Sequence, residues 1–370
     1  MFYIVFIFFL LFILYLCSMK ISVSSPIISN DRKSNIELLR IVSMMLVLVT
    51  HACYVSLGPP TFSDISTSLC SSILRGLSES MSDVCVNSFI LISGWFGIKC
   101  RLNRFLELIF QVLFINIVIY ILFKTLGIIN SYNLQNWLDL FLFRNGAYWF
   151  VKAYIVLFIL SPVLNAFVEH SGKRQLEYFL LSFYLIQTIY GFYINVGWFS
   201  GGYSPLSFIG LYLIARYIKL YPNRFTRLNK YADILLYFFV SLLTAICSLS
   251  MTYWWGKVGT VLFQNSSPFI VVSSVYFFLF FTKISFSSRF VNWISVSCFA
   301  AYIVHCSPFI FYPFYVDVIK SWFITETSTL FLLNTLGIIV VFFVVSILFD
   351  KVRIMTWSLM RRIFACVSLK

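Results

Sequence analysis

Long apolar stretches, separated by short polar segments, recur along the whole of this 370-residue sequence. An α-helix of about 20 apolar residues crosses the roughly 30 Å hydrocarbon core of a bilayer and satisfies its backbone hydrogen bonds internally. The sequence therefore predicts an all-α, polytopic membrane protein with ten transmembrane helices. We expect these helices at residues 36–57, 84–98, 105–127, 148–168, 177–196, 204–220, 231–252, 259–282, 290–312 and 329–350.

The composition agrees with this prediction and excludes a soluble domain. Hydrophobic residues make up 61% of the chain and charged residues only 11%, whereas a soluble globular domain has about 25% charged residues. The net charge of +14 could indicate a nucleic-acid-binding protein. The positions of the basic residues, however, explain this charge without nucleic acid.

Most of the 27 lysines and arginines fall in alternate connecting segments. They lie before the first predicted helix and after the second, fourth, sixth, eighth and tenth. The other connecting segments contain only Arg75, Arg144, Lys257 and Lys320. Because basic residues are retained on the cytoplasmic side of a membrane, we expect both ends of the ten-helix core in the cytoplasm. The predicted location is the inner (cytoplasmic) cell membrane, with membrane lipids as partners and no nucleic acid.

An additional apolar run, FYIVFIFFLLFILYLC, precedes this core. It could be an extra transmembrane helix, a signal-like segment, or sequence upstream of a translation start at Met19. We divide the chain into a hydrophobic N-terminal segment and leader (1–32), a membrane domain (33–350) and a basic tail (351–370). The tail is amphipathic and is expected to lie on the inner membrane surface. The longest polar connection spans residues 58–83, so no soluble domain is expected.

The nine cysteines form no C-x-x-C pair and no spacing with histidine that is typical of a metal site. We therefore predict no bound metal. Most of the cysteines lie in or beside apolar stretches, where a small buried thiol is typical. Cys70 and Cys85 flank one polar connection and could form a disulfide.

The first predicted helix carries an arginine and a histidine in an otherwise apolar sequence, NIELLRIVSMMLVLVTHACYV. Ionisable residues are costly inside a bilayer, so they are candidates for function. Eleven residues turn a helix through about three full turns, so Arg40 and His51 share one face and lie about 16 Å apart along the axis. Glu37 lies one turn before Arg40 and can pair with it. Taken separately, Arg40 could be a snorkelling side chain and His51 a buried structural histidine.

A second histidine, His305, lies as far from the start of the ninth predicted helix as His51 lies from the start of the first. We therefore expect the two histidines at similar depth, where they could face one cavity. A structural hydrogen bond between helices remains an alternative for His305. His170 lies in a basic connecting segment and is expected to be a solvated surface residue.

Small and basic residues mark the second predicted helix. Ser93 and Gly94 form a small-residue pair, for which close helix packing is an alternative to a functional role. Arg101 and Arg104 follow this helix and share one face. They could contact phosphates, or they could only set the topology.

The fourth predicted helix begins with aromatic residues and a lysine. Tyr148 and Trp149 fit an interfacial aromatic belt. Lys152 lies about one turn further in and could be a snorkelling lysine.

In order along the chain, several of these segments resemble the acyltransferase 3 family of integral membrane acyltransferases, many of which O-acetylate bacterial surface polysaccharides. NIELLRIVSMMLVLVTH resembles the first-helix pattern of a basic residue, ten further residues and a histidine. NSFILISGWF resembles the second-helix F-x-x-S-G-[YF] pattern, and RLNR resembles the basic pattern that follows it. YWFVKAYIVLFILSP and SCFAAYIVHCSPF resemble later blocks, and the resemblance covers residues 33–350.

The resemblance implies an O-acetyltransferase that moves an acyl group, usually acetyl from cytoplasmic acetyl-CoA, to a hydroxyl of a cell-surface polysaccharide or its lipid-linked precursor. By the same resemblance His51 is the catalytic base, and Arg40 acts with Arg101 and Arg104 on the donor phosphates. The residues expected to bind substrate are Ser93, Trp149, Lys152, Tyr302 and His305. Cys298 and Phe299 depart from the family, in which a more polar or glycine-containing pair is expected.

Two other classes of membrane protein also place polar residues inside the bilayer. A transporter, or a flippase of lipid-linked oligosaccharides, is expected to show internal repeats or helices broken by Gly or Pro in corresponding halves. Neither is evident in the sequence. A polysaccharide polymerase usually carries a large outer loop, and no connecting segment here is long enough to be one.

Overall fold

The computed structural model describes residues 32–128, 148–194 and 196–367. Over these residues the chain is helical and contains no strand. Six of the described helices are long and apolar enough to cross a membrane: Ser34–Val55, Leu102–Thr125, Trp149–His170, Lys230–Trp255, Gly259–Thr282 and Ser328–Met360. The prediction of an all-α protein with membrane-spanning helices is therefore confirmed. The additional apolar run at the N-terminus lies outside the described residues.

The first half of the described chain contains α2 (Ser34–Thr50), α3 (Phe62–Thr67), α4 (Leu69–Ser82), α5 (Val84–Phe96), α6 (Leu102–Thr125), α8 (Trp149–His170) and α9 (Lys173–Ile186). The second half contains α10 (Pro205–Leu220), α11 (Lys230–Trp255), α12 (Pro268–Thr282), α13 (Arg289–Ser295), α14 (Phe299–His305), α15 (Asp317–Thr325) and α16 (Ser328–Val367). Three π-helical segments, His51–Val55, Gln187–Tyr193 and Phe311–Val316, extend or join these helices, and two 3-10 segments lie at Ser200–Gly202 and Gly256–Phe263.

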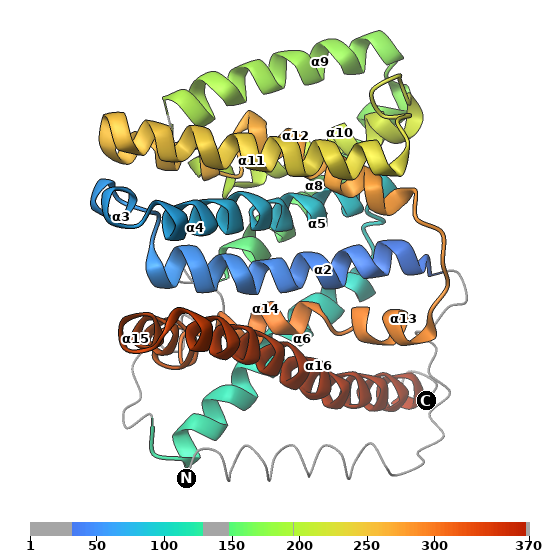
Figure 1. Cartoon of the computed structure of the whole chain (residues 1–370). Helices are drawn as coiled ribbons and strands as arrows, with labels where there is room; N and C mark the ends of the chain where they lie inside the picture. The colour runs from blue at the N-terminus through green and yellow to red at the C-terminus, as the bar shows by residue number, and fades with distance from the viewer. Residues whose placement is uncertain (1–31, 129–147, 195, 368–370) are drawn as a thin grey trace.

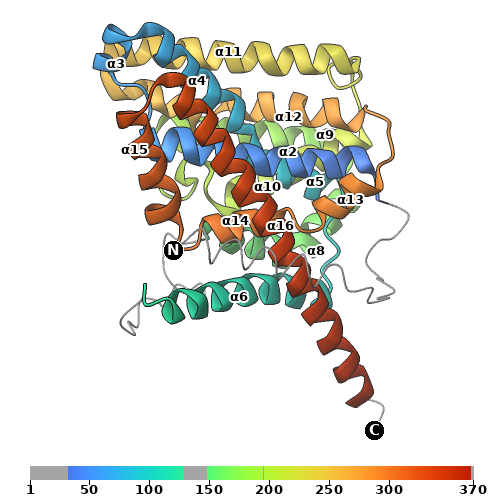
Figure 2. The ribbon, with the colours of Figure 1, turned by 60° about the horizontal axis from the view of Figure 1, so that its bottom comes forward.

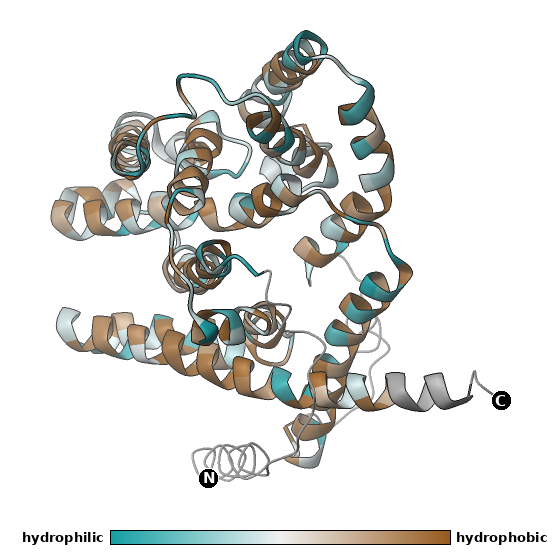
Figure 3. Ribbon diagram, turned by 90° about the vertical axis from the view of Figure 1, so that its right-hand side faces the viewer, coloured by the Kyte–Doolittle hydropathy of each residue, from teal (hydrophilic) through white to brown (hydrophobic). Residues whose placement is uncertain are grey.

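The outer faces of the helices are apolar, as a lipid environment requires. Helix α11 shows this most clearly, because Leu235, Phe239, Leu242 and Ile246 form one helical stripe and are all exposed. Residues at this spacing lie on a single face of a helix. Figure 3 shows that hydrophobic residues dominate the other long helices too. In water such a surface would aggregate, so it fits contact with hydrocarbon chains.

Helix α5 lies near the centre of the packing. It contacts α2, α10 and α12, and Figure 1 shows α11, the α4–α5 pair and α2 running side by side. Gly94 permits the close approach to α10, because a Cβ atom there would lie 2.4 Å from the Tyr212 carbonyl oxygen. The packing role predicted for the Ser93–Gly94 pair is therefore confirmed at Gly94.

The prediction that residues 290–312 form one continuous ninth helix is wrong. Helix α13 ends at Ser295, α14 covers only Phe299–His305, and a non-helical stretch follows before the π-helical segment Phe311–Val316. Pro308 lies in that stretch, and a proline has no backbone N–H to continue a helix. Apolar composition alone does not reveal such breaks, because turns buried in protein inside a membrane protein can also be apolar.

Two connecting segments also differ from their predictions. The segment 58–83, expected to be a polar loop, contains α3 and α4, and α4 leads directly into α5. The tail from residue 351, predicted as a separate segment, belongs to the same helix as the last predicted span. This helix, α16, has 40 residues and is about 60 Å long. Figure 2 shows its C-terminal end projecting beyond the other helices. An ion pair between Asp350 Oδ2 and Arg353 Nη2, 2.8 Å long, crosses the predicted boundary.

The disulfide alternative for Cys70 and Cys85 is not realised. Both thiols are free, and Cys70 is exposed whereas Cys85 is buried. Tyr148 also differs from its prediction, because it is buried rather than part of an interfacial belt. Its hydroxyl lies 2.6 Å from Asn116 Oδ1 and 2.9 Å from the Ile303 carbonyl oxygen. Tyr148 thus ties the start of α8 to α6 and to α14.

Candidate active site

Two histidines from opposite ends of the chain meet inside the helical bundle. His51 is the first residue of the π-helical segment that continues α2, and His305 is the last residue of α14. The Nδ1 atom of His51 lies 2.6 Å from Nε2 of His305. The side chain of His305 is fully buried. The structure therefore joins the two histidines that the sequence could place only at similar depth.

The hydrogen bonds around this pair define where its protons lie. Nδ1 of His305 is 2.5 Å from the Ala301 carbonyl oxygen. A carbonyl oxygen can only accept, so His305 Nδ1 carries hydrogen and, in the neutral ring, Nε2 carries the lone pair. That lone pair accepts the Nδ1–H of His51 across the 2.6 Å contact. The remaining nitrogen of a neutral His51, Nε2, is consequently unprotonated and can accept a proton.

The π-helical turn at His51 is held by a tyrosine from the segment after α14. The hydroxyl of Tyr315 donates to the Leu48 carbonyl oxygen over 2.7 Å, and its ring centroid lies 5.6 Å from that of His305. Single π-turns inside α-helices occur often at functional sites, because they change the direction of a side chain. Tyr315 therefore contacts the ring of His305 and is bonded to the helical turn that precedes His51.

A cysteine that the sequence analysis treated as a buried thiol also adjoins the pair. Cys306 Sγ lies 3.4 Å from His305 Nε2 and 3.8 Å from His51 Nδ1. These three side chains are of the types that hold zinc, and their ligand atoms lie within 4.8 Å of one another. Two nitrogens bound to one zinc ion lie about 3.3 Å apart, however, and the two histidine nitrogens are 2.6 Å apart. The geometry is that of a hydrogen bond between the rings.

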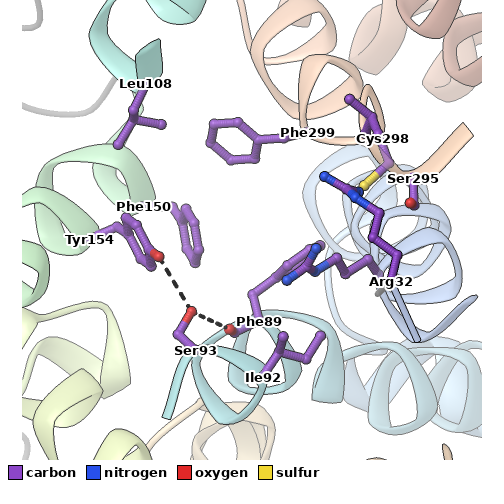
Figure 4. A pocket seen from close by; sticks show the side chains of 12 residues that line it. Arg32, Phe89, Ile92, Ser93, Leu108, Phe150, Tyr154, Ser295, Cys298 and Phe299 are labelled. Carbon is purple, nitrogen blue, oxygen red and sulfur yellow. Dashed lines mark hydrogen bonds between the residues drawn. The ribbon is translucent and has the colours of Figure 1, made fainter. Parts of the chain in front are cut away.

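A cavity of about 250 Å³, which we call the inner cavity, lies one ring away from this pair: neither histidine lines it, but Phe150 and Phe299 do, and both contact Tyr302 next to His305. Residues of six helices, of the α13–α14 junction and of the segment before α2 line it: Arg32, Arg40, Phe89, Ile92, Ser93, Leu108, Phe150, Tyr154, Ser295, Val296, Cys298 and Phe299. Figure 4 shows Phe150 and Tyr154 on one side of it and Arg32 and Ser295 on the other. The inner cavity thus has a cationic end and an aromatic end.

At the cationic end, one glutamate organises two arginines. Glu37 Oε1 lies 3.1 Å from Arg40 Nη1, and Glu37 Oε2 lies 3.4 Å from Arg32 Nη1. Ser295 donates its hydroxyl hydrogen to Glu37 Oε2 over 2.6 Å. The Glu37–Arg40 pair predicted from helical spacing is therefore confirmed. Two guanidinium groups and one carboxylate leave a net positive charge of one at this end.

At the aromatic end, a row of contacting rings leads from the inner cavity to the histidines, with Phe299 stacked on Tyr302 and Tyr302 edge-to-face with His305. The ring centroid of Phe299 lies 5.7 Å from that of Tyr302, which lies 6.2 Å from that of His305. Tyr302 is buried, and its ring also lies 5.9 Å from that of Phe150. The predicted residues Tyr302, His305 and His51 therefore form one contiguous group next to the cavity.

The structure distributes the other predicted residues between the cavity and the surface. Ser93 lines the inner cavity, and its hydroxyl lies 3.4 Å from that of Tyr154. Trp149 packs against Tyr203, with ring centroids 4.6 Å apart. Lys152 is half-buried in the first turn of α8.

Arg101 and Arg104 are not brought to the histidine pair. Both side chains are exposed at the start of α6, and neither lines the inner cavity. Arg32, one of the basic residues before the first predicted helix that were expected only to set the topology, lines the cavity instead. His170 is exposed at the end of α8, as predicted.

These features define an integral membrane protein in which a histidine pair inside the helical bundle adjoins, through Tyr302, a cavity with arginines at its other end. The family profile described as acyltransferase domain matches residues 33–351, nearly the whole chain, and the chain belongs to this family. Membership supports an acyltransferase activity and confirms the resemblance seen in the sequence. No curated protein and no solved structure matches the chain.

Proposed function

We propose that this protein transfers an acetyl group from acetyl-CoA to a hydroxyl of a cell-surface polysaccharide or its lipid-linked precursor. The observation that carries the proposal is the hydrogen-bonded chain from the Ala301 carbonyl through His305 to His51. It leaves His51 Nε2 unprotonated, which is the state that a general base needs.

In the proposed reaction, His51 Nε2 removes the proton of the acceptor hydroxyl as its oxygen attacks the thioester carbonyl carbon. The C–O bond forms and the C–S bond to CoA breaks. The proton held by His51 then passes to the departing CoA thiolate. His305 acts as a positioning residue, since its Nε2 fixes the tautomer of His51 and stabilises the protonated ring, as the third member of a catalytic triad does.

The donor is proposed to enter through the inner cavity. Arg40 lies about 16 Å from His51 along the same helix, which is a distance that a pantetheine arm can cover. Arg40 and Arg32 would contact the diphosphate at the cationic end, where charge-assisted hydrogen bonds are strong. The contribution of Arg101 and Arg104 to donor binding stays a prediction, and their exposure would restrict it to the outermost part of the donor.

The acceptor is proposed to approach from the opposite side of the histidine pair. Trp149 and Lys152 lie at the start of α8, which the ten-helix topology proposed for the inner membrane places at the end of the bundle away from Arg40. An aromatic ring and a lysine suit the apolar face and the hydroxyl groups of a sugar. Under this topology CoA binds from the cytoplasm and the glycan hydroxyl enters from the outside.

One structural feature favours the alternative of a transporter or flippase: the helix is interrupted at His305. Discontinuous helices line the substrate sites of many transporters. The two proposals differ in whether a covalent bond is broken, so an assay for chemistry separates them.

The test is an acetyl-transfer assay on the purified full-length protein in lipid nanodiscs, with acetyl-CoA labelled in the acetyl group. We expect label to move to glycan acceptors, or to water when acceptor is absent. We expect His51→Ala to lower the rate at least about 100-fold. His170→Ala is the matched control, because it removes an exposed histidine of the same chain. Equal rates for His51→Ala and the control would overturn the assignment of the base, and no transfer by the unchanged protein would overturn the proposed function.

A further inference from the structure

A second cavity, of about 380 Å³, lies where the start of α2 meets the segment between α12 and α13. We call it the basic pocket. Its lining residues are Arg32, Lys33, Ser34, Asn35, Thr282, Lys283, Ile284, Ser285, Phe286 and Ser287. Three of them are cationic, and none of these described lining residues is acidic. The composition is that of a site for an anion.

Side-chain hydrogen bonds connect the two walls of the basic pocket. The Asn35 amide donates to the Phe281 carbonyl oxygen over 3.0 Å. The Ser34 hydroxyl accepts from the backbone N–H of Ser288 over 2.9 Å and donates to Asn292 Oδ1 over 3.0 Å. The pocket is therefore pre-formed, so a ligand would bind without first ordering these walls.

The charges of the pocket are compensated to different degrees. Lys283 Nζ pairs with Asp233 Oδ2 over 2.5 Å, and Arg32 Nη1 lies 3.4 Å from Glu37 Oε2. Lys33 lines the pocket and is exposed. Because Glu37 also pairs with Arg40, two acids compensate four cations, and a net positive charge remains for a ligand.

Phe286 gives the pocket an apolar face as well. Its side chain is 38% exposed, in a segment whose neighbours Ser285 and Ser287 are also exposed. An exposed aromatic ring beside cations can stack with a nucleobase, whose phosphates the cations then bind. Neither feature alone indicates a nucleotide, but the basic pocket combines them.

The basic pocket and the inner cavity share Arg32 in their linings. Starting from the histidine pair, the lining residues are first the aromatic rings of the inner cavity and then its arginines. The lysines, serines and phenylalanine of the basic pocket follow. An acyl-CoA has a matching order of groups, which are the thioester and pantetheine arm, the diphosphate, and the adenosine 3′-phosphate. We propose that the basic pocket binds the adenosine 3′-phosphate of the acyl donor, with Lys33 on the 3′-phosphate and Phe286 on the adenine. This inference rests on the proposed function.

The test compares donors with and without the nucleotide, using the full-length protein in nanodiscs. Lys33→Ala and the double variant Lys33→Ala/Phe286→Ala are measured against Arg174→Ala, which removes an exposed arginine outside both cavities. For acetyl-CoA, we expect KM to rise about tenfold for loss of the charged contact, with kcat unchanged. With S-acetyl-N-acetylcysteamine, which lacks the nucleotide, the variants and the control should react at equal rates. Equal loss with both donors, or no change with acetyl-CoA, would overturn the proposal.

A direct binding measurement keeps this inference separable from the proposed function. Adenosine 3′,5′-bisphosphate is titrated into the unchanged protein and the variants in phosphatidylcholine nanodiscs, without any turnover. We expect binding by the unchanged protein and about tenfold weaker binding by Lys33→Ala. The same titration in phosphatidylglycerol nanodiscs tests an anionic lipid headgroup as the occupant. Nucleotide binding that the variants do not weaken, together with weaker retention of phosphatidylglycerol by the variants, would assign the pocket to lipid and overturn the proposal.

Discussion

Nδ1 of His51 lies 2.6 Å from Nε2 of His305, although 254 residues separate them in the chain. Because Ala301 fixes the proton on the far side of His305, this contact sets the tautomer of His51 and not only its position. The two rings therefore work as one unit, whose free nitrogen is Nε2 of His51. Each prediction about the histidines follows from this order of donors and acceptors.

Substitution of His305 should lower kcat more than it raises KM for the donor. His305→Ala removes the acceptor for His51 Nδ1–H, so the tautomer and orientation of His51 are no longer fixed. We expect kcat to fall about 100-fold or more. His305→Gln offers a side-chain oxygen as acceptor and should recover part of this loss. Steady-state kinetics of both variants, with thermal unfolding to check folding, measures the effect.

The rescue by glutamine distinguishes positioning from simple packing. A merely structural role for His305 would make His305→Gln at least as harmful as His305→Ala, because both disturb the same buried space. That result, with both variants folded, would contradict the positioning role.

The contact between the histidines shows how far the sequence could lead. Helical periodicity placed Arg40 and His51 on one face, and the structure retains that helix. The same counting placed His305 at matching depth, but on a continuous helix that does not exist. The two histidines meet all the same, because α14 ends at His305 and packs against α2. The contact itself depends on that break, which composition does not encode.

Most of the residues that line the inner cavity could not be predicted from the sequence. Ser295, which holds Glu37, and Arg32, which lines both cavities, appear in the sequence as an ordinary serine and a topology-setting charge. Their roles come from contacts across the bundle, and helical spacing within one segment carries no information about such contacts. Conversely, Arg101 and Arg104 matched a basic pattern but lie exposed, outside the inner cavity.

Arg40→Lys should weaken donor binding although the charge is retained. Arg40 Nη1 lies 3.1 Å and 3.2 Å from the two oxygens of Glu37, and the planar guanidinium can hold this carboxylate while its other N–H groups face the cavity. A lysine offers one point of contact and cannot do both equally well. We expect KM for acetyl-CoA to rise about tenfold, while Arg174→Lys leaves it unchanged. Equal KM values for the two variants would argue against a donor contact at Arg40.

Metal chelation should leave activity intact. The 2.6 Å separation of the two histidine nitrogens is too short for both to bind one zinc ion, which needs about 3.3 Å between them. We therefore expect dialysis against EDTA to leave the rate unchanged, and Cys306→Ser to retain most activity because the serine keeps a small polar group beside the rings. Loss of activity on dialysis, restored by added zinc, would show that the histidines and Cys306 hold a metal.

Gly94→Ala should destabilise the protein, whereas Gly337→Ala should not. A Cβ atom at Gly94 would lie 2.4 Å from the Tyr212 carbonyl oxygen and 2.8 Å from Ala215 Cβ, so α5 and α10 would have to separate. Overpacking of this kind costs about 1–3 kcal/mol. A Cβ atom at Gly337 on α16 meets no atom within 4 Å, so the alanine should be neutral or slightly stabilising. Thermal unfolding of both variants in the same detergent measures the difference. Equal stability of the two variants would show that this helix contact tolerates a methyl group.

The same substitution should also affect the kinetics. Ser93, the neighbour of Gly94, lines the inner cavity, so separation of α5 from α10 should raise KM for acetyl-CoA in Gly94→Ala but not in Gly337→Ala.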